Sequence, residues 1–92
     1  MTLNNNLNEK VMFAHFCITY NVKPYELAKL IAFANRAYSV GVRRANGKAT
    51  EKQEHVAADD FETQAKSMNF GVMWPGFWPI LTRDGQEVNC PI

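Results

Sequence analysis

Met68–Cys90, with the sequence MNFGVMWPGFWPILTRDGQEVNC, is the stretch that decides how the rest of this chain folds. It holds both tryptophans and three of the five glycines. Its apolar runs predict three short strands, Phe70–Trp74, Phe77–Thr82 and Gln86–Cys90. Pro75–Gly76 separates the first two runs, and Asp84–Gly85 separates the last two. Asp-Gly between extended runs is typical of a tight hairpin, because a type I′ turn needs positive φ, which both residues tolerate.

A three-stranded sheet of this size, with an aromatic face, is not stable alone in water, so helices must cover it. Three segments with helical periodicity precede it. We therefore predict an α+β fold of three helices followed by a small three-stranded antiparallel meander (α-α-α-β-β-β). The chain of 92 residues is long enough for one hydrophobic core. The prediction is a single compact domain over residues 1–92, with flexibility expected only in residues 1–5.

Asn4, Asn5 and Asn6 are each candidate N-caps of a first helix, and Glu9 lies three residues after Asn6, as in a capping box. Apolar residues follow at helical spacing from Leu7 to Tyr20 and cover a wide arc. We therefore expect most of this helix to be buried.

The second helix is predicted to begin at Pro24, because a proline costs nothing in the first turn of a helix. Its apolar stripe runs from Leu27 to Tyr38, with charged residues on the opposite side, so it is the clearest amphipathic helix of the chain. We expect it to end near Tyr38, with Gly41 as the candidate C-cap, although propensity alone leaves a longer helix open.

The third helix is predicted to begin after Thr50, where Gln53 completes a second capping box. Its apolar stripe, which ends at Met68, is narrow and rich in alanine. We expect this helix to lie on the surface, with only Phe61 deeply buried.

The charges are distributed unevenly along the chain, although the net charge is only +1. Residues 1–50 hold seven basic and two acidic residues, which gives +5, and residues 51–92 hold three basic and seven acidic residues, which gives −4. The asymmetry predicts either a two-faced binding surface or two elements that attract each other.

The N-terminal residues show neither the basic nor the apolar region of a secretory signal, and no uncharged run reaches the roughly 20 residues of a membrane span. We therefore expect a soluble cytoplasmic protein without membrane contact. Two cysteines are too few for a disulfide framework. Cys17 lies in an apolar run and is expected to be a small buried residue, so a Cys17–Cys90 disulfide is disfavoured in a reducing compartment.

Catalysis and metal binding are not predicted. His15, Cys17, His55 and Cys90 are suitable ligand types, but they lack the spacing of a zinc site. Nothing marks either histidine as a base for Cys17, and the adjacent Asp59 and Asp60 point to different sides of a helix. The hypothesis is a protein that is not an enzyme and that needs no metal or cofactor.

Nucleic-acid binding is the alternative hypothesis. Three helices followed by a hairpin is the element order of a winged-helix DNA- or RNA-binding regulator. A basic segment made up of Arg36, Arg43, Arg44 and Lys48 could follow a phosphate backbone together with Lys52. The third helix, which would have to enter the major groove, is strongly acidic, and this observation counts against the hypothesis.

Protein recognition is the hypothesis that the sequence favours. Trp74, Phe77 and Trp78 crowd one proline-flanked turn, and such rings are enriched where proteins bind one another. Two alternatives stay open: the tryptophans could belong to the core, and the basic segment could pair internally with Glu51, Glu54 or Asp59.

The chain is thus predicted to be a non-catalytic binding module. Its general profile is similar to that of small phage and mobile-element proteins, anti-CRISPR proteins among them, that inhibit or redirect a host protein or nucleoprotein complex. The predicted partner-binding residues are Arg36, Arg43, Arg44, Lys48, Trp74, Phe77 and Trp78.

Overall fold

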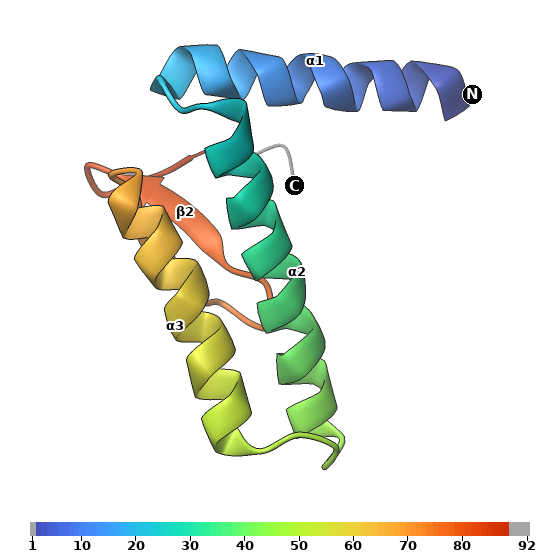
Figure 1. Cartoon of the computed structure of the whole chain (residues 1–92), viewed down its shortest axis with the longest axis vertical. Helices are drawn as coiled ribbons and strands as arrows, with labels where there is room; N and C mark the ends of the chain where they lie inside the picture. The colour runs from blue at the N-terminus through green and yellow to red at the C-terminus, as the bar shows by residue number, and fades with distance from the viewer. Residues whose placement is uncertain (1, 89–92) are drawn as a thin grey trace.

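The computed structural model describes the backbone of residues 2–88 and the side chains of residues 9–88. Three helices precede a three-stranded antiparallel sheet, which confirms the predicted α+β fold (Figure 1). The elements are α1 (Thr2–Tyr20), α2 (Pro24–Ala45), α3 (Glu51–Ser67), β1 (Gly71–Met73), β2 (Ile80–Arg83) and β3 (Gln86–Glu87).

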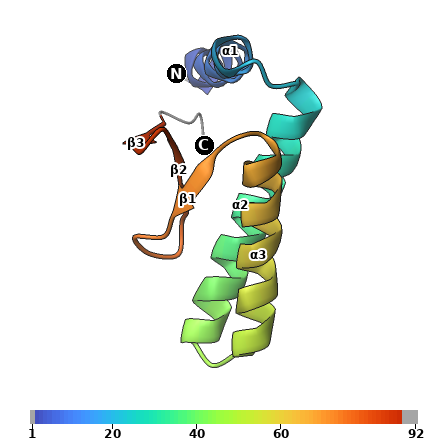
Figure 2. The ribbon, with the colours of Figure 1, turned by 90° about the vertical axis from the view of Figure 1, so that its left-hand side faces the viewer.

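The helices α2 and α3 form an antiparallel hairpin, and the sheet packs on one side of it (Figures 1 and 2). The first helix lies across one end of this hairpin and extends beyond it (Figure 1). The loop between α2 and α3 lies at the other end. The fold therefore has two layers, a helical hairpin and a small sheet, with α1 placed over one end.

The strands are shorter than the sequence predicts. The sheet has the order β1-β2-β3, and Val72 pairs with Leu81 in the first ladder. Residues 74–79 form a loop rather than a two-residue break, and the predicted end of the third strand at Cys90 lies outside the described residues. The turn between β2 and β3 is confirmed, because Asp84 and Gly85 have φ of 55° and 78°, as a type I′ turn requires.

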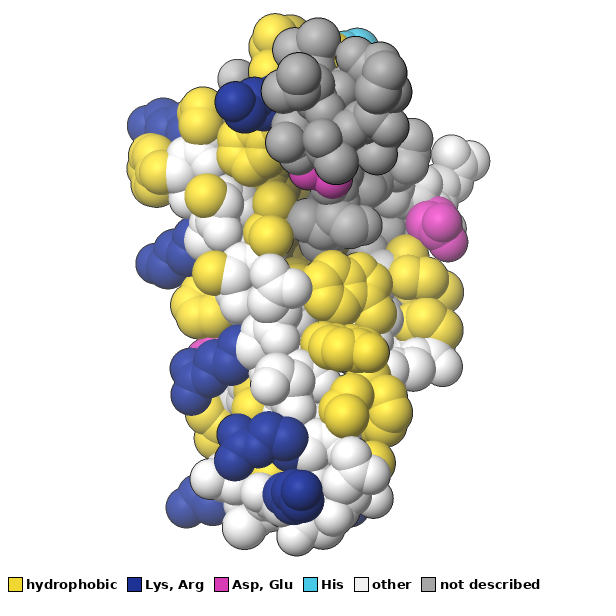
Figure 3. Space-filling view, turned by 90° about the vertical axis from the view of Figure 1, so that its right-hand side faces the viewer, with side chains coloured by type: hydrophobic (Ala, Val, Ile, Leu, Met, Phe, Trp, Pro, Cys, Tyr) yellow, Lys and Arg dark blue, Asp and Glu magenta, His cyan; other side chains and the backbone are white. Residues whose placement is uncertain are grey.

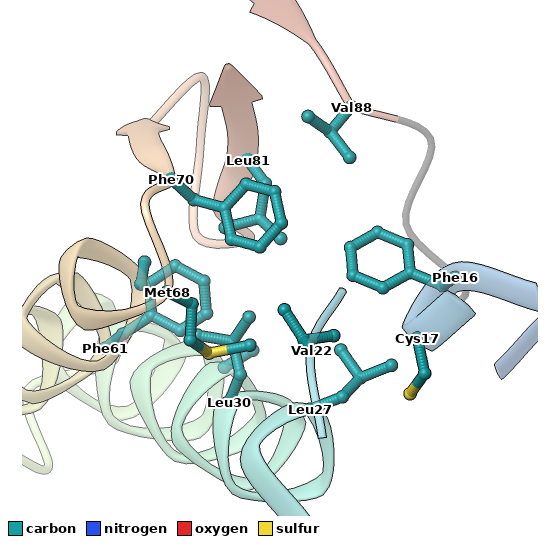
Figure 4. Close-up of a cluster of buried hydrophobic side chains, with 12 residues drawn as sticks. Phe16, Cys17, Val22, Leu27, Leu30, Phe61, Met68, Phe70, Leu81 and Val88 are labelled. Carbon is teal, nitrogen blue, oxygen red and sulfur yellow. The ribbon is translucent and has the colours of Figure 1, made fainter. Parts of the chain in front are cut away.

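The core lies where the C-terminal end of α1, the first half of α2, the second half of α3 and the sheet meet (Figure 4). Its largest fully buried side chains are Phe61, Leu27, Leu30 and Leu81. Phe61 is deeply buried, as predicted, but the alanines of α3 at positions 57 and 65 are buried with it, because α3 packs closely along α2.

The expectation that α1 is largely buried is wrong. Among its described side chains, those of residues 9–20, only Phe16 and Cys17 are buried, whereas Ile18 is 81% exposed. Within residues 9–20 the helix contacts the core through Phe13, Phe16, Cys17 and Tyr20, whereas the apolar side chains of Val11, Met12 and Ile18 are exposed. It also begins at Thr2, before all three candidate caps, Asn4, Asn5 and Asn6. No helix within residues 2–88 is both long and apolar enough to cross a lipid bilayer.

The second helix continues to Ala45, about two turns beyond the predicted end at Tyr38. Gly41 is therefore not a C-cap but an interior, buried helical residue. Its lack of a side chain makes room for Phe77, whose Cδ1 lies 2.8 Å from the position that a Cβ of residue 41 would occupy. The aromatic loop after β1 thus packs directly against the backbone of α2.

The start of α3 agrees with the sequence. The backbone N–H of Gln53 donates to Thr50 Oγ1 at 3.1 Å, and the N–H of Thr50 donates to Gln53 Oε1 at 2.8 Å. This reciprocal pair satisfies two backbone donors at the helix start. The cap fixes where α3 begins, and with it the first turn that carries Glu51, Lys52 and Glu54.

Candidate functional site

Basic side chains form a stripe along the outward side of α2. Lys29, Arg36 and Arg43 are spaced by seven residues, which is close to two helical turns, so they share one side of the helix. Figure 3 shows Lys and Arg side chains along one edge of the molecule and at its lower end, with hydrophobic side chains beside them. The extension of α2 to Ala45 is what brings Arg43 into this stripe.

A hollow of about 440 Å³ lies beside this stripe, between α2 and the first half of α3. Its charged lining residues are Arg36 and Arg43 from α2 and Lys52 from α3, without a carboxylate. Val40 and Val56 add apolar surface, and the other lining residues are small or neutral. We call this hollow the outer groove. Lys48 lies next to it, because its carbonyl accepts a hydrogen bond of 3.5 Å from Arg43 Nη2.

The structure separates the four predicted basic residues into two kinds. Arg36 Nη1 lies 3.5 Å from Asp60 Oδ2, so one cation of the outer groove is partly neutralised. Arg43 and Lys48 pair with no carboxylate among the side chains of residues 9–88.

Arg44 points to the other side of α2, where Nε lies 3.4 Å from Glu54 and Nη2 lies 3.9 Å from Glu51. The ion pairs of Arg36 and Arg44 are exposed to water and contribute little stability.

The three aromatic residues of the loop do not form one patch. Trp74 and Trp78 are half-buried and pack against the core, and Phe77 is 44% exposed. The ring of Trp74 lies 5.8 Å from that of Phe61, and the ring of Trp78 lies 5.8 Å from that of Tyr38. Each tryptophan thus packs part of its ring against the core and leaves the rest of the ring exposed.

A second hollow, of about 700 Å³, lies on the opposite side of the helical hairpin, under the loop of residues 74–79. We call it the inner pocket. Trp74 and Phe77 line it together with Glu51, Glu54 and Glu62. The indole Nε1 of Trp74 donates to Glu62 Oε2 at 2.8 Å. Sequence reasoning missed Glu62, since a glutamate on an acidic helix looks like any solvated residue until the loop folds over it.

Cys17 and the two histidines do not come together. Cys17 is buried in the core, and this burial raises the pKa of its thiol, so the side chain stays protonated near neutral pH. His15 is exposed on α1, whereas His55 lies near the start of α3, at the far end of the molecule (Figure 1). Among the described residues, no three His, Cys, Asp or Glu side chains are placed to hold a metal ion.

Comparison of the chain with protein-family models, with curated proteins and with solved structures found no match. The outer groove and the inner pocket are therefore interpreted from their own geometry.

Proposed function

We propose that the protein is a non-catalytic binding module that binds an acidic protein surface through the outer groove and the adjoining side of α2. The observation that carries this proposal is the lining of the groove, in which Arg36, Arg43 and Lys52 surround a hollow without a carboxylate. Guanidinium groups form bidentate, charge-assisted hydrogen bonds with carboxylates, so such a groove favours an acidic partner.

Apolar and aromatic side chains beside the cations favour a protein over a nucleic acid. Val56 is 43% exposed and Val40 is partly exposed, so both offer apolar contact inside the groove. Tyr38 is 47% exposed on the same helix, next to Trp78. Arginine with tyrosine and tryptophan is the composition typical of protein-binding hot spots. A phosphate backbone would use the cations alone.

The arrangement of the helices gives the winged-helix alternative little support. A helix-turn-helix motif needs two helices at a steep angle, with the second in the major groove. Here α2 and α3 run antiparallel, side by side (Figure 1). The third helix also carries Glu51, Glu54 and Asp59, which would repel phosphates.

The class of partner that we propose is a host protein or nucleoprotein complex in the cytoplasm, with the acidic surface on its protein component. The narrower hypothesis of a phage or anti-CRISPR inhibitor rests only on the small size of the chain and on a sequence without a recognisable cofactor-binding motif. The ring pair of Tyr38 and Trp78 lines neither hollow and would form the aromatic edge of the interface, whereas Trp74 and Phe77 line the inner pocket.

The test is a double charge reversal at Arg43 and Lys48, the two of the four predicted basic residues that pair with no carboxylate among the described side chains. Arg43→Glu with Lys48→Glu should weaken binding of an acidic amphipathic peptide by about tenfold or more, because charge-assisted contacts are lost and repulsion replaces them. Fluorescence anisotropy with a labelled Glu- and Leu-rich peptide measures the affinity, and a short DNA duplex serves as the competing ligand.

The matched control is Lys10→Glu with Lys66→Glu, which changes the net charge equally but lies outside the groove. We expect this control to bind the peptide as the unmodified protein does. An equal loss in both double variants would reduce the effect to net charge and contradict the proposal. Tight binding of the duplex without binding of the peptide would instead support the nucleic-acid alternative.

A further inference from the structure

The inner pocket has the size and shape of a ligand site. It is a half-open hollow of about 700 Å³ between α2, α3 and the loop that follows β1, which is within the usual range for small-molecule sites. Its space exists because three lining positions, Ala37, Gly41 and Ala58, carry little or no side chain. Trp74 and Phe77 supply aromatic surface on the loop side.

The position of Phe77 in this pocket is specified by the helix behind it. Its Cδ1 lies 2.8 Å from the place that a Cβ of residue 41 would occupy, closer than any real side chain allows. A glycine at this point of α2 lets the ring lie directly on the helix backbone. The aromatic side of the pocket is therefore packed against the hairpin rather than merely near it.

The carboxylate of Glu62 lies in the pocket without a matching cation. It is half-buried, and Trp74 Nε1 donates to its Oε2 at 2.8 Å, which orients the group and leaves Oε1 available. No Lys or Arg pairs with it among the side chains of residues 9–88. A half-buried carboxylate is more stable when a cation lies next to it, because water solvates it incompletely.

The charges around the pocket leave it acidic. Glu51 and Glu54 both lie within ion-pair distance of Arg44, and Lys52 lines the pocket near its helix start. Three carboxylates against these two cations leave one negative charge unbalanced. The guanidinium of Arg44 also illustrates the type of group that these carboxylates accept.

We propose that the inner pocket binds an organic cation, an alkylguanidinium or alkylammonium group. The charged end would pair with Glu62, and the alkyl body would lie against Trp74 and Phe77, which attract cations through their π faces. Such a group occurs both in free amines and guanidines and as an arginine or lysine side chain of a protein. This site has the opposite charge preference to the outer groove and lies on the other side of the hairpin.

The test follows the indole N–H signals of the two tryptophans by nuclear magnetic resonance. The Trp74 signal should shift saturably on titration with a Gly-Arg-Gly peptide, because its N–H donates to the carboxylate that pairs with the ligand. The Trp78 signal serves as the internal reference. The matched ligand control is the same peptide with citrulline, which has nearly the shape of arginine but no charge, and it should leave the Trp74 signal unchanged.

The key variant is Glu62→Gln, which removes the negative charge but keeps an amide oxygen that can accept the hydrogen bond from Trp74 Nε1. It should weaken binding by about tenfold, and Ala58→Leu should abolish binding by filling the hollow. Glu87→Gln is the control, because Glu87 is exposed on β3 and does not line the pocket, so its effect should stay below about twofold. Thermal unfolding of each variant separates lost binding from lost structure.

Methylguanidinium in place of the peptide distinguishes the two sources of the cation. Binding of both ligands supports a site for a free cation, and binding of the peptide alone supports a partner's side chain. The proposal is overturned if the citrulline peptide shifts Trp74 equally, if Glu62→Gln binds unchanged, or if neither ligand moves the signal. The Arg43→Glu, Lys48→Glu double variant should keep this binding, so failure of one proposal leaves the other standing.

Discussion

Arg83 is a single residue that connects three parts of the fold. Its Nη2 donates to the carbonyl oxygen of Met68 at 2.9 Å, and its Nε donates to that of Asn69 at 3.3 Å. These carbonyls lie at the end of α3, where helical partners are lacking. The guanidinium also lies 4.2 Å from the ring centroid of Phe70 and 5.1 Å from that of Tyr20. One side chain thus links β2 to α3 and to α1.

Replacing Arg83 with lysine should destabilise the protein by about 1–2 kcal/mol, because an ammonium keeps the charge but cannot make both hydrogen bonds and lie over the rings. Urea denaturation would show a lower midpoint with an unchanged slope. Arg36→Lys is the control, since Arg36 makes only an exposed ion pair, and it should cost less than about 0.5 kcal/mol. Equal stability of the two variants would contradict this role of Arg83.

Among the elements, the β2–β3 hairpin depends on the backbone of its turn rather than on side-chain packing. Asp84 and Gly85 both have positive φ, and apart from its chain neighbours no described residue has an atom within 4 Å of the place where a Cβ of Gly85 would be. Any loss of stability on substitution at Gly85 therefore comes from backbone strain alone. The hairpin also matters beyond itself, because Val88, just after β3, packs into the core.

Gly85→Val should lower the free energy of unfolding by on the order of 1 kcal/mol or more, because a β-branched residue resists positive φ. Gly85→Asn should cost much less, since asparagine tolerates this conformation. Thermal unfolding of the two variants in parallel is the measurement. If valine and asparagine prove equally harmless, positive φ is not what holds the turn.

At the scale of the whole molecule, the core contacts that α1 makes within residues 9–20 lie toward its C-terminal end. The radius of gyration is 14.1 Å, against about 12 Å expected for a compact domain of this length, and α1 extends beyond the hairpin (Figure 1). Val11 and Ile18 are 58% and 81% exposed on it. Tertiary packing therefore supports the C-terminal end of the helix much more than residues 9–15.

Hydrogen exchange should follow this division. Amides of residues 9–15 are expected to exchange well before those of residues 27–34 in α2, because opening that part of α1 exposes little buried surface. Mass spectrometry of the exchanging protein at two concentrations measures it. Equal protection of both segments would contradict the prediction, and protection that rises with concentration would show that a second copy covers the helix.

Local chemistry was sufficient to predict several features from the sequence. Thr50 with Gln53 marks the start of α3, and Asp84–Gly85 marks the turn, because a cap or a turn involves only neighbouring residues. The basic candidates Arg43 and Lys48 also follow from the sequence, since their region lacks acidic residues.

Features that depend on contacts between residues far apart in the sequence were decided only by the tertiary structure. Arg43 and Arg44 are neighbours in the sequence, yet a helix turns by about 100° per residue, so one faces the outer groove and the other faces α3. Hydrophobic periodicity showed that α1 has a wide apolar arc but not how much of it the body could cover. Glu62 lies in a pocket because Trp74, on the loop after β1, packs over it and donates a hydrogen bond to its carboxylate. The sequence around Glu62 does not reveal this contact, because it depends on a residue from another element.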